Sequence, residues 1–312
     1  MLSHTIARSW RSAAALGLLA ASCTSLQVGA PTLDLDSDVR SATGARGAAV
    51  MRRTPNQDFV TIDEAADELA NADVVFLGEQ HDSAECHAVQ LALTRALAER
   101  RDEVIVSLEM FERDAQRRLD LYLDGAIDEE MFLAGARPWS NYEEHYRGVV
   151  EFARENDYDV LAANVYRPIA SRVARGGLAA GVGDAWAARS IDVSDGEYRR
   201  LFNEIMTGGG HGSMDMSALD DIYAAQCIKD DTMAESIADA LAEAGDDAPL
   251  VVHWNGRFHS DYGLGTVERL RRRRPDLNLA VVSMIATPDL GRALEGDEVD
   301  LGHFVILVPP TE

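Results

Sequence analysis

Short apolar segments that end in polar or charged residues recur along this chain, and they constrain its fold more than any other feature. The first covers residues 74–77, and Glu79, His81 and Asp82 follow it. Four apolar residues are too few for a buried helix but suit a buried strand. Ionisable groups at a strand end are costly to bury and indicate a functional site. A helix cap on Asp82 or Ser83 is the simpler interpretation, but it leaves Glu79 and His81 unexplained.

Three more segments of this kind follow. Residues 104–108 lead to Glu109, residues 159–163 lead to Asn164 and Arg167, and residues 249–252 lead to His253 and then His259. Helical patterns separate the first three, and strands that alternate with helices form parallel units whose carboxyl ends share one edge. Ligands bind at that edge. We therefore expect an α/β fold with a mostly parallel β-sheet flanked by helices, and with Glu79, His81, Glu109, Asn164, Arg167 and His259 converging.

The expected cluster has the composition of a catalytic or metal site. Glu79, His81, Glu109 and His259 could hold a divalent metal ion, activate water, or act as base and acid without metal. Arg167 would stabilise developing negative charge. The sequence has neither a His-Glu-x-x-His helix nor a Gly-x-Ser-x-Gly turn, which disfavours zincin and serine hydrolases. A polar network that serves only packing is the remaining alternative.

The overall charge excludes one class of partner. The chain has 312 residues and a net charge of −24 at pH 7. Binding of nucleic acid requires clustered cations that neutralise phosphates, so we expect no nucleic-acid partner. The one basic run, residues 269–274, is explained by the preference of cations for the C-terminus of a helix.

The N-terminus is typical of an exported protein. Arg8 and Arg11 precede an apolar stretch, residues 13–21, that is too short to span a bilayer, so residues 1–22 read as a signal peptide. Cys23 follows small residues, as in a bacterial lipobox. We expect lipidation at Cys23, and a membrane-anchored lipoprotein that faces the periplasm or the cell surface. An ordinary secretory peptide is the alternative.

The rest of the chain divides into a tether, a main domain and an insertion. Residues 23–55 have no periodicity and suggest a lipidated N-terminus with a flexible tether. Residues 56–312 form the α/β domain. Within it, residues 177–247 lose the strand alternation, and we interpret them as a helical insertion that could cover the site as a lid. Its glycine-rich loop carries His211.

Two helical segments carry further histidines. Residues 83–101 predict a helix whose first turns hold Cys86, a buried thiol, and His87. His87 either borders the site or, as the simpler interpretation, is a partly exposed helix histidine. Residues 136–146 concentrate aromatic side chains, including Tyr142, His145 and Tyr146. This segment is either a packed loop or an aromatic wall over a pocket, and the sequence favours neither.

Five motifs in order carry a family resemblance that covers residues 60–308. They are Gly78-Glu79-Gln-His81-Asp82, Glu109-Met-Phe-Glu-Arg113 with Gln116, Asn164-x-x-Arg167, Ala225-Gln226-x-x-x-Asp230-Asp-Thr-Met233-Ala234, and Gly256-Arg-Phe-His259. In this order the chain resembles ChaN-like proteins, which are bacterial, iron-regulated, haem-binding lipoproteins. They share a superfamily with Tiki-type metalloproteases and erythromycin esterases.

The resemblance implies a haem-binding, membrane-anchored lipoprotein that takes part in haem or iron uptake. It implies a homodimer with haem at its interface, bound through a tyrosinate, which is a sound axial ligand for ferric haem. The matched motifs do not identify the ligand. Its candidates, with two histidines that could ligate or support it, are Tyr142, His145, Tyr146, Tyr166, His211, Tyr223 and Tyr262. A hydrolase of the peptidase or esterase type, using the cluster at the strand ends, is the alternative function.

Overall fold

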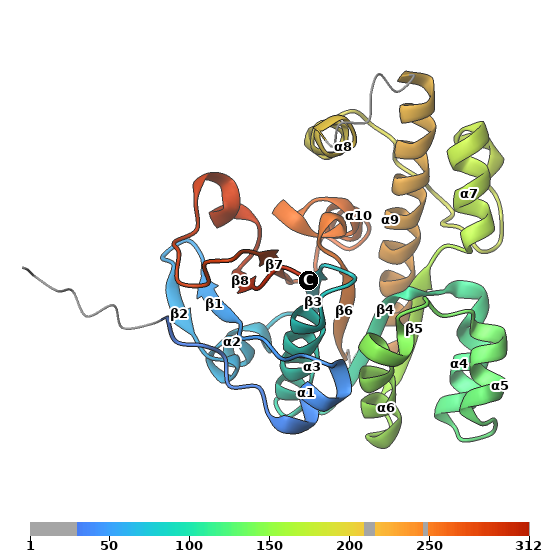
Figure 1. The fold of residues 1–312 in the computed structure, drawn as a ribbon. Coiled ribbons are helices and arrows are strands. Elements are labelled where there is room, and N and C mark those ends of the chain that lie inside the picture. The colour runs from blue at the N-terminus through green and yellow to red at the C-terminus, as the bar shows by residue number, and fades with distance from the viewer. Residues whose placement is uncertain (1–29, 209–215, 246–248, 312) are drawn as a thin grey trace, which may run out of the picture.

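An eight-stranded sheet forms the centre of the computed structural model, which describes residues 30–208, 216–245 and 249–311 (Figure 1). The strands lie in the order β2-β1-β8-β7-β3-β6-β4-β5, and those from β8 to β5 are parallel. The antiparallel strands β1 and β2 extend one side of the sheet. The mostly parallel α/β fold predicted from the sequence is confirmed. The strands are β1 (Val50–Arg53), β2 (Asp58–Val60), β3 (Val74–Glu79), β4 (Val104–Glu112), β5 (Asp159–Asn164), β6 (Leu250–Gly256), β7 (Leu279–Ala286) and β8 (Phe304–Val308).

Helices cover both faces of the sheet, which is why the central strands read as continuous apolar runs. Every residue of β3 and β6 is buried. The side chains of Val75 and Leu77 pack in one apolar core, and those of Val74 and Phe76 pack in a second core on the opposite face. The first core contains α1 (Ser37–Thr43), α2 (Ile62–Leu69), α3 (Ala84–Ala98) and α6 (Arg147–Glu155); the second contains α9 (Met216–Ala244) and α10 (Gly265–Arg273).

The remaining helices lie beyond the sheet. Helices α4 (Gln116–Leu123) and α5 (Glu129–Ala136) flank β5, while α7 (Arg167–Gly176), α8 (Glu197–Gly208) and part of α9 extend past the sheet (Figure 1). Short helical turns are η1 (Arg113–Ala115), η2 (Tyr142–Tyr146), η3 (Leu178–Ala180), η4 (Arg257–His259), η5 (Asp261–Gly263) and η6 (Gly296–Asp300). Within the described residues, no helix combines the length and hydropathy needed to cross a membrane.

The structure differs from the expected tether and adds detail to the expected insertion. Residues 33–53 pack on the domain through Leu33, Leu35 and Val39, all buried, so the part of the expected tether that is described is ordered. Their apolar residues are spaced irregularly, which is why periodicity missed them. Helix α9, in the expected insertion, packs against β5, α7 and α10 and belongs to the helical layer on the sheet.

Candidate functional site

The carboxyl ends of three neighbouring strands bring the predicted acids and histidines together. β3 ends on Glu79, β6 ends on Gly256 and leads to His259, and β4 carries Glu109 near its end. Because β6 lies between β3 and β4, its end separates the two glutamates. The backbone N–H of Gly256 donates to Glu109 Oε2 at 2.7 Å. The predicted convergence is therefore present in the structure for Glu79, Glu109 and His259, together with His81.

Glu79 is the centre of a first group. Its side chain is buried, and Oε1 accepts from His81 Nδ1 at 2.8 Å and from the Tyr146 hydroxyl at 2.6 Å. Oε2 lies 3.0 Å from His87 Nδ1. Burial raises the pKa of Glu79, but the adjacent His87 and His81 outweigh burial and hold it well below its usual range. A carboxylate with three such partners stays ionised.

His87 is the member of this group that lies on a helix. Of its two interpretations, a histidine that borders the site agrees with the structure, and a partly exposed imidazole is wrong because His87 is fully buried. Its Nε2 faces the His81 carbonyl at 3.1 Å, and Nδ1 faces Gln90 Oε1 at 3.1 Å as well as Glu79. All three partners are acceptors, so both ring nitrogens carry protons. Burial lowers the pKa of His87, but Glu79 raises it by more.

A second group centres on His259, which is buried between two carboxylates. Its Nδ1 donates to Asp230 Oδ1 at 2.7 Å, and its Nε2 lies 3.3 Å from Glu109 Oε1. Asp230 comes from α9 and also accepts from the hydroxyls of Tyr198 at 2.6 Å and Thr266 at 2.9 Å. Burial lowers the pKa of His259, but Glu109 and Asp230 together raise it to about 10.

The two groups meet around Gly256. A Cβ atom at this position would lie 2.7 Å from His81 Cε1, 2.9 Å from its Nε2 and 3.6 Å from Glu109 Oε2. Only glycine lets His81 pack this closely against the backbone at position 256. The side chain of His81 is 43% exposed, and the Trp139 ring stands edge-on to it with centroids 4.6 Å apart. His81 is therefore the member of the cluster that a ligand can reach.

The charge states limit what this cluster can do. Burial raises the pKa of Glu109, but His259 outweighs burial and lowers it to about 2. Ionised carboxylates beside protonated imidazoles form closed ion pairs, whereas a general base works best with a pKa near the operating pH. Within the described residues, no group of three or more His, Cys, Asp or Glu side chains is arranged to hold a metal ion. The expected metal set of Glu79, His81, Glu109 and His259 is thus not supported.

Arg167 and Asn164 belong to a different neighbourhood at the end of β5. Asn164 donates to the Glu109 carbonyl at 3.0 Å and so joins the two strand ends. Arg167 begins α7, and its Nε lies 3.1 Å from Glu112 Oε1. It does not contact the acid and histidine groups, because α7 leads the chain away from β6. The stabilising role expected for Arg167 in a hydrolytic site has no support in this position.

Most of the candidate tyrosines are buried. Tyr142, Tyr146 and Tyr223 expose 3% or less of their surface, and burial is the largest cause of a raised pKa in each. Tyr262 is half-buried, donates to Asp297 at 3.2 Å, and has its pKa raised to about 12, again mainly by burial. Tyr166 is also half-buried, with the guanidinium carbon of Arg137 5.4 Å from its ring centre.

Of the remaining candidates, one lies in the described part of the chain and the others lie outside it. His145 is half-buried and stacks on His87 with ring centroids 4.5 Å apart, so it supports the buried group. Burial lowers the pKa of His145, and the neighbouring His87 lowers it further. His211 and Cys23 lie outside the described residues. The aromatic segment is packed, because Tyr142 and Tyr146 are both core residues.

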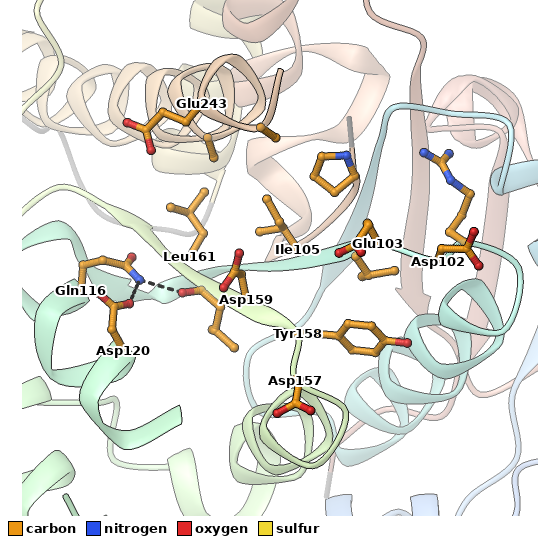
Figure 2. Close-up of a pocket in the computed structure, with 16 residues that line it drawn as sticks. Asp102, Glu103, Ile105, Gln116, Asp120, Asp157, Tyr158, Asp159, Leu161 and Glu243 are labelled. Atoms are coloured by element: carbon orange, nitrogen blue, oxygen red, sulfur yellow. Dashed lines mark hydrogen bonds between the residues drawn. The ribbon is translucent and has the colours of Figure 1, made fainter. Parts of the chain in front are cut away.

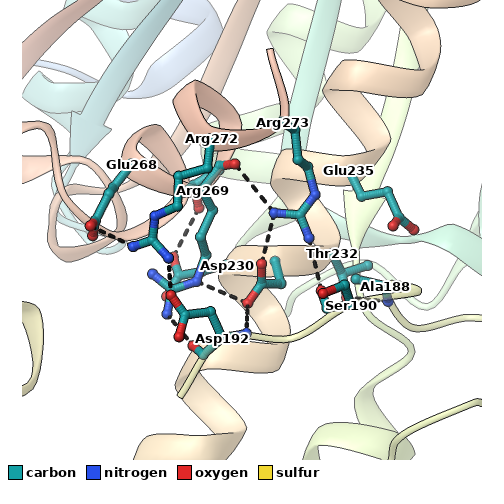
Figure 3. A network of polar contacts seen from close by, with 12 residues as sticks. Ala188, Ser190, Asp192, Asp230, Thr232, Glu235, Glu268, Arg269, Arg272 and Arg273 are labelled. Atoms are coloured by element: carbon teal, nitrogen blue, oxygen red, sulfur yellow. Dashed lines mark hydrogen bonds and ion pairs between the residues drawn. The ribbon is translucent and has the colours of Figure 1, made fainter. Parts of the chain in front are cut away.

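Arginines of helix α10 pair with acids on neighbouring elements (Figure 3). Arg269 donates to Asp231 Oδ2 at 3.0 Å, and Arg273 pairs with Asp231 Oδ1 at 2.8 Å. Arg269 also donates to the carbonyl of Asp192 at 2.9 Å. These contacts fasten the loop before α8 onto α9 and α10. The basic run therefore holds the helical layer that supplies Asp230 to the site.

A broad pocket lies at the opposite edge of the sheet (Figure 2). It has a volume of about 1050 Å³ and opens where β4 and β5 begin. Its acidic lining residues are Asp102, Glu103, Asp120, Asp157, Asp159 and Glu243. Gln116 lies beside it and caps the edge of β5, with hydrogen bonds to the Val160 carbonyl at 2.8 Å and the Ala162 N–H at 2.7 Å. None of the predicted site residues lines this cavity.

Comparison with known proteins identifies one family. A family described as "Haem-binding uptake, Tiki superfamily, ChaN" matches residues 65–270. Among curated proteins, "Protein RETICULATA-RELATED 5, chloroplastic" of Arabidopsis thaliana is 24% identical over 245 residues. That alignment covers 69% of this chain and 31% of the relative, so this chain spans about a third of that protein.

The fold has a counterpart among solved structures. The structure described as cofacial heme binding to ChaN of Campylobacter jejuni is 18% identical, with a TM-score of 0.66, and the match covers 84% of this chain and 97% of that one. A mutant of the erythromycin esterase EreC in its open conformation is 15% identical, with a TM-score of 0.44 and 83% of each chain covered.

Proposed function

We propose that this chain, which belongs to the ChaN family of haem-binding uptake proteins in the Tiki superfamily, binds haem. Family membership supports this function, and the donor set near the end of β5 fits it. Tyrosinate is one of the axial ligands that proteins use for ferric haem. Tyr166 is half-buried rather than enclosed, and the guanidinium carbon of Arg137 lies 5.4 Å from its ring centre. We therefore propose Tyr166 as the iron ligand.

The other candidate tyrosines fit this role poorly. Tyr146 donates its proton to Glu79, and Tyr223 donates to the Ser194 carbonyl at 3.2 Å. Tyr142 is buried without a hydrogen-bond partner for its hydroxyl. A tyrosinate at any of these positions would bury an unpaired negative charge or place it beside a carboxylate, which is costly. Ligation there would require the core to rearrange.

Titration with hemin, followed at the Soret band, tests the proposal. The wild-type chain should bind hemin saturably and give a ferric spectrum with tyrosinate character. Tyr166→Phe should weaken binding by about tenfold or more and shift the Soret band. Tyr262→Phe is the matched control, because Tyr262 is also half-buried but lies on a different element. An unchanged spectrum in Tyr166→Phe would exclude this ligand, and absence of saturable binding would refute the function.

We also propose that the protein is exported, anchored by a lipid on Cys23, and active in haem or iron uptake as a homodimer. The sequence of residues 1–23 supports the anchor, and the family supports uptake. Cys23→Ser should release the protein from the membrane fraction of cells that express it. Sedimentation with and without hemin should show whether haem and dimer formation are linked. A soluble wild-type protein would contradict the anchor, and a monomer under both conditions would contradict the dimer.

Hydrolysis is a second candidate because the partly exposed His81 and the buried Glu109 both lie against Gly256. A substrate that reaches His81 would therefore meet an imidazole close to a carboxylate. His259, which is protonated, could then donate a proton. A panel of ester and peptide substrates, with Glu109→Gln as the comparison, tests this candidate. Turnover that survives Glu109→Gln would show that another site is responsible.

A further inference from the structure

We infer that Arg137 and Arg167 form a carboxylate-binding pair beside Tyr166 that recognises the propionates of haem. The inference rests on the haem-binding function proposed above. It identifies the propionate carboxylates as the feature of haem that residues at this edge of the sheet recognise. Haem combines an apolar plane with two carboxylates, so a site for it needs cations as well as an iron ligand. The end of β5 is where the structure places both.

Glu112 positions the two arginines. It is buried at the end of β4 and exposes only 5% of its surface. Its Oε1 lies 3.1 Å from Arg167 Nε, and its Oε2 accepts from Arg137 Nη2 at 3.3 Å. Because one buried carboxylate holds both guanidinium groups, it limits their motion while their side chains remain 57% and 45% exposed. Second contacts of this kind orient a binding group before its ligand arrives.

Arg137 is held in a conformation that few residues adopt. It caps α5 with a φ of 51° in the left-handed region, where residues other than glycine are uncommon. Its Nη2 donates to both oxygens of Asp114 at 2.7 and 2.8 Å, in addition to Glu112. The surrounding ion pairs thus fix an unfavourable backbone conformation, and the result is a guanidinium over the Tyr166 ring. Strain of this kind is characteristic of functional sites.

Arg167 keeps the geometry needed to take a carboxylate. Its only ion pair with the described residues uses Nε, and no hydrogen bond from either terminal nitrogen to another described residue is present. A guanidinium binds a carboxylate best through two parallel N–H groups. Arg167 can offer such a pair without giving up Glu112. Arg167 follows Tyr166 directly in the sequence, so the cation and the proposed iron ligand both lie at the start of α7.

The electrostatics of the whole chain make local cations necessary. With a net charge of −24, the protein repels a ligand that carries two carboxylates over most of its surface. Glu112 and Asp114 neutralise the two arginines in the unliganded protein. A propionate on the open side of Arg167 gains charge-assisted hydrogen bonds that a neutral ester cannot replace. The pair therefore predicts discrimination between haem and its esters.

Titration of the full chain with hemin and with hemin dimethyl ester tests the inference. Wild-type protein should bind the ester about tenfold more weakly than hemin. Arg167→Gln should lose about tenfold in hemin affinity, bind both ligands equally, and keep the wild-type Soret maximum. Arg137→Gln should act in the same direction, and Arg167→Lys, which keeps the charge, should recover part of the discrimination.

Arg172→Gln is the matched control. Arg172 also lies on α7, and its side chain is 45% exposed. It pairs with Asp184, a partly exposed acid, at 3.0 Å. Its replacement should change neither affinity. Equal binding of hemin and ester by the wild type, or unchanged hemin affinity in Arg167→Gln, would overturn the inference and leave haem binding intact. Absence of saturable hemin binding by the wild type would overturn both.

Discussion

Replacing Asp230 by asparagine tests the charge assignment at the centre of the site. Asp230 is fully buried and accepts from His259, Thr266 and Tyr198. Asparagine has nearly the same size, so the substitution removes a charge without opening a cavity. The protonated His259 then keeps Glu109, 3.3 Å from its Nε2, as its only carboxylate partner among the described residues. We therefore expect a large loss of stability.

The magnitude follows from the pKa of His259. Burial lowers it, but Glu109 and Asp230 raise it from 6.5 to about 10. A difference of 3.5 (10 − 6.5) corresponds to about 5 kcal/mol, at about 1.4 kcal/mol per pKa unit. Removal of one partner from a buried ion pair costs about 3–5 kcal/mol. Because Glu109 remains, we expect Asp230→Asn to lose about 3 kcal/mol of unfolding free energy at pH 6.5.

The pH dependence has a definite sign. The folded-state pKa of His259 lies above its unfolded value, so its contribution is fully present below pH 6.5 and is lost as the pH rises through about 10. His81 and His87, whose pKa values are also raised against the effect of burial by Glu79, act in the same direction. The wild-type unfolding free energy should fall across this window. The fall should be shallower in Asp230→Asn, because less of the shift remains.

Urea denaturation at pH 6.5, 8 and 9.5 measures both quantities. Asp239→Asn is the control, since Asp239 lies on the same helix, is 46% exposed, and pairs with an exposed arginine. Exposed pairs contribute about 0–1 kcal/mol. A loss below about 1 kcal/mol in Asp230→Asn at pH 6.5, or a wild-type stability that stays constant from pH 6.5 to 9.5, would refute a protonated His259 between two carboxylates.

Three further outcomes are expected. Gly256→Ala should displace His81, because the added Cβ would lie 2.7 Å from Cε1, and should cost about 1–3 kcal/mol in urea denaturation. Cys86 and Cys227 are buried, and burial raises the pKa of each to about 12; alkylation followed by peptide mapping should modify them only after unfolding. Thr61→Ala removes the capping box of α2 and should cost about 1 kcal/mol in thermal or urea unfolding.

The part of the site that was predictable from sequence lies directly at strand ends. Glu79, Glu109 and His259 follow short apolar runs, and parallel strands with right-handed crossovers leave little freedom in where those runs end. The same reasoning placed Arg167 at this edge, but it did not identify Glu112 as the partner of Arg167. Its side chain follows the start of α7 to Glu112, and the direction of a helix after a strand depends on packing that no local pattern encodes.

Residues on helices were harder to place. His87 lies on α3, where most positions are buried on one side of the helix or the other. The spacing of the apolar residues therefore gave no indication that this imidazole would be buried. Asp230 lies on α9, which is 29 residues long and buried along much of its length. Its motif was recognised, but its role depends on contact with His259, 29 residues away in sequence. Such pairings arise from tertiary packing and are visible only in the structure.

The sheet order separates the two chemistries that the sequence suggested for one edge. From β3 to β5 there are three strand spacings, through β6 and β4, or about 14 Å at about 4.8 Å each. Glu79 and His81 follow the first of these strands, and Tyr166 follows the last. One iron does not take ligands from both ends of this span while His81 stays hydrogen-bonded to Glu79. Haem binding and hydrolysis are therefore separable by mutation: Glu109→Gln should leave hemin affinity unchanged, and Tyr166→Phe should leave any hydrolysis unchanged. A variant that abolished both without unfolding the protein would show that the two ends act as one site.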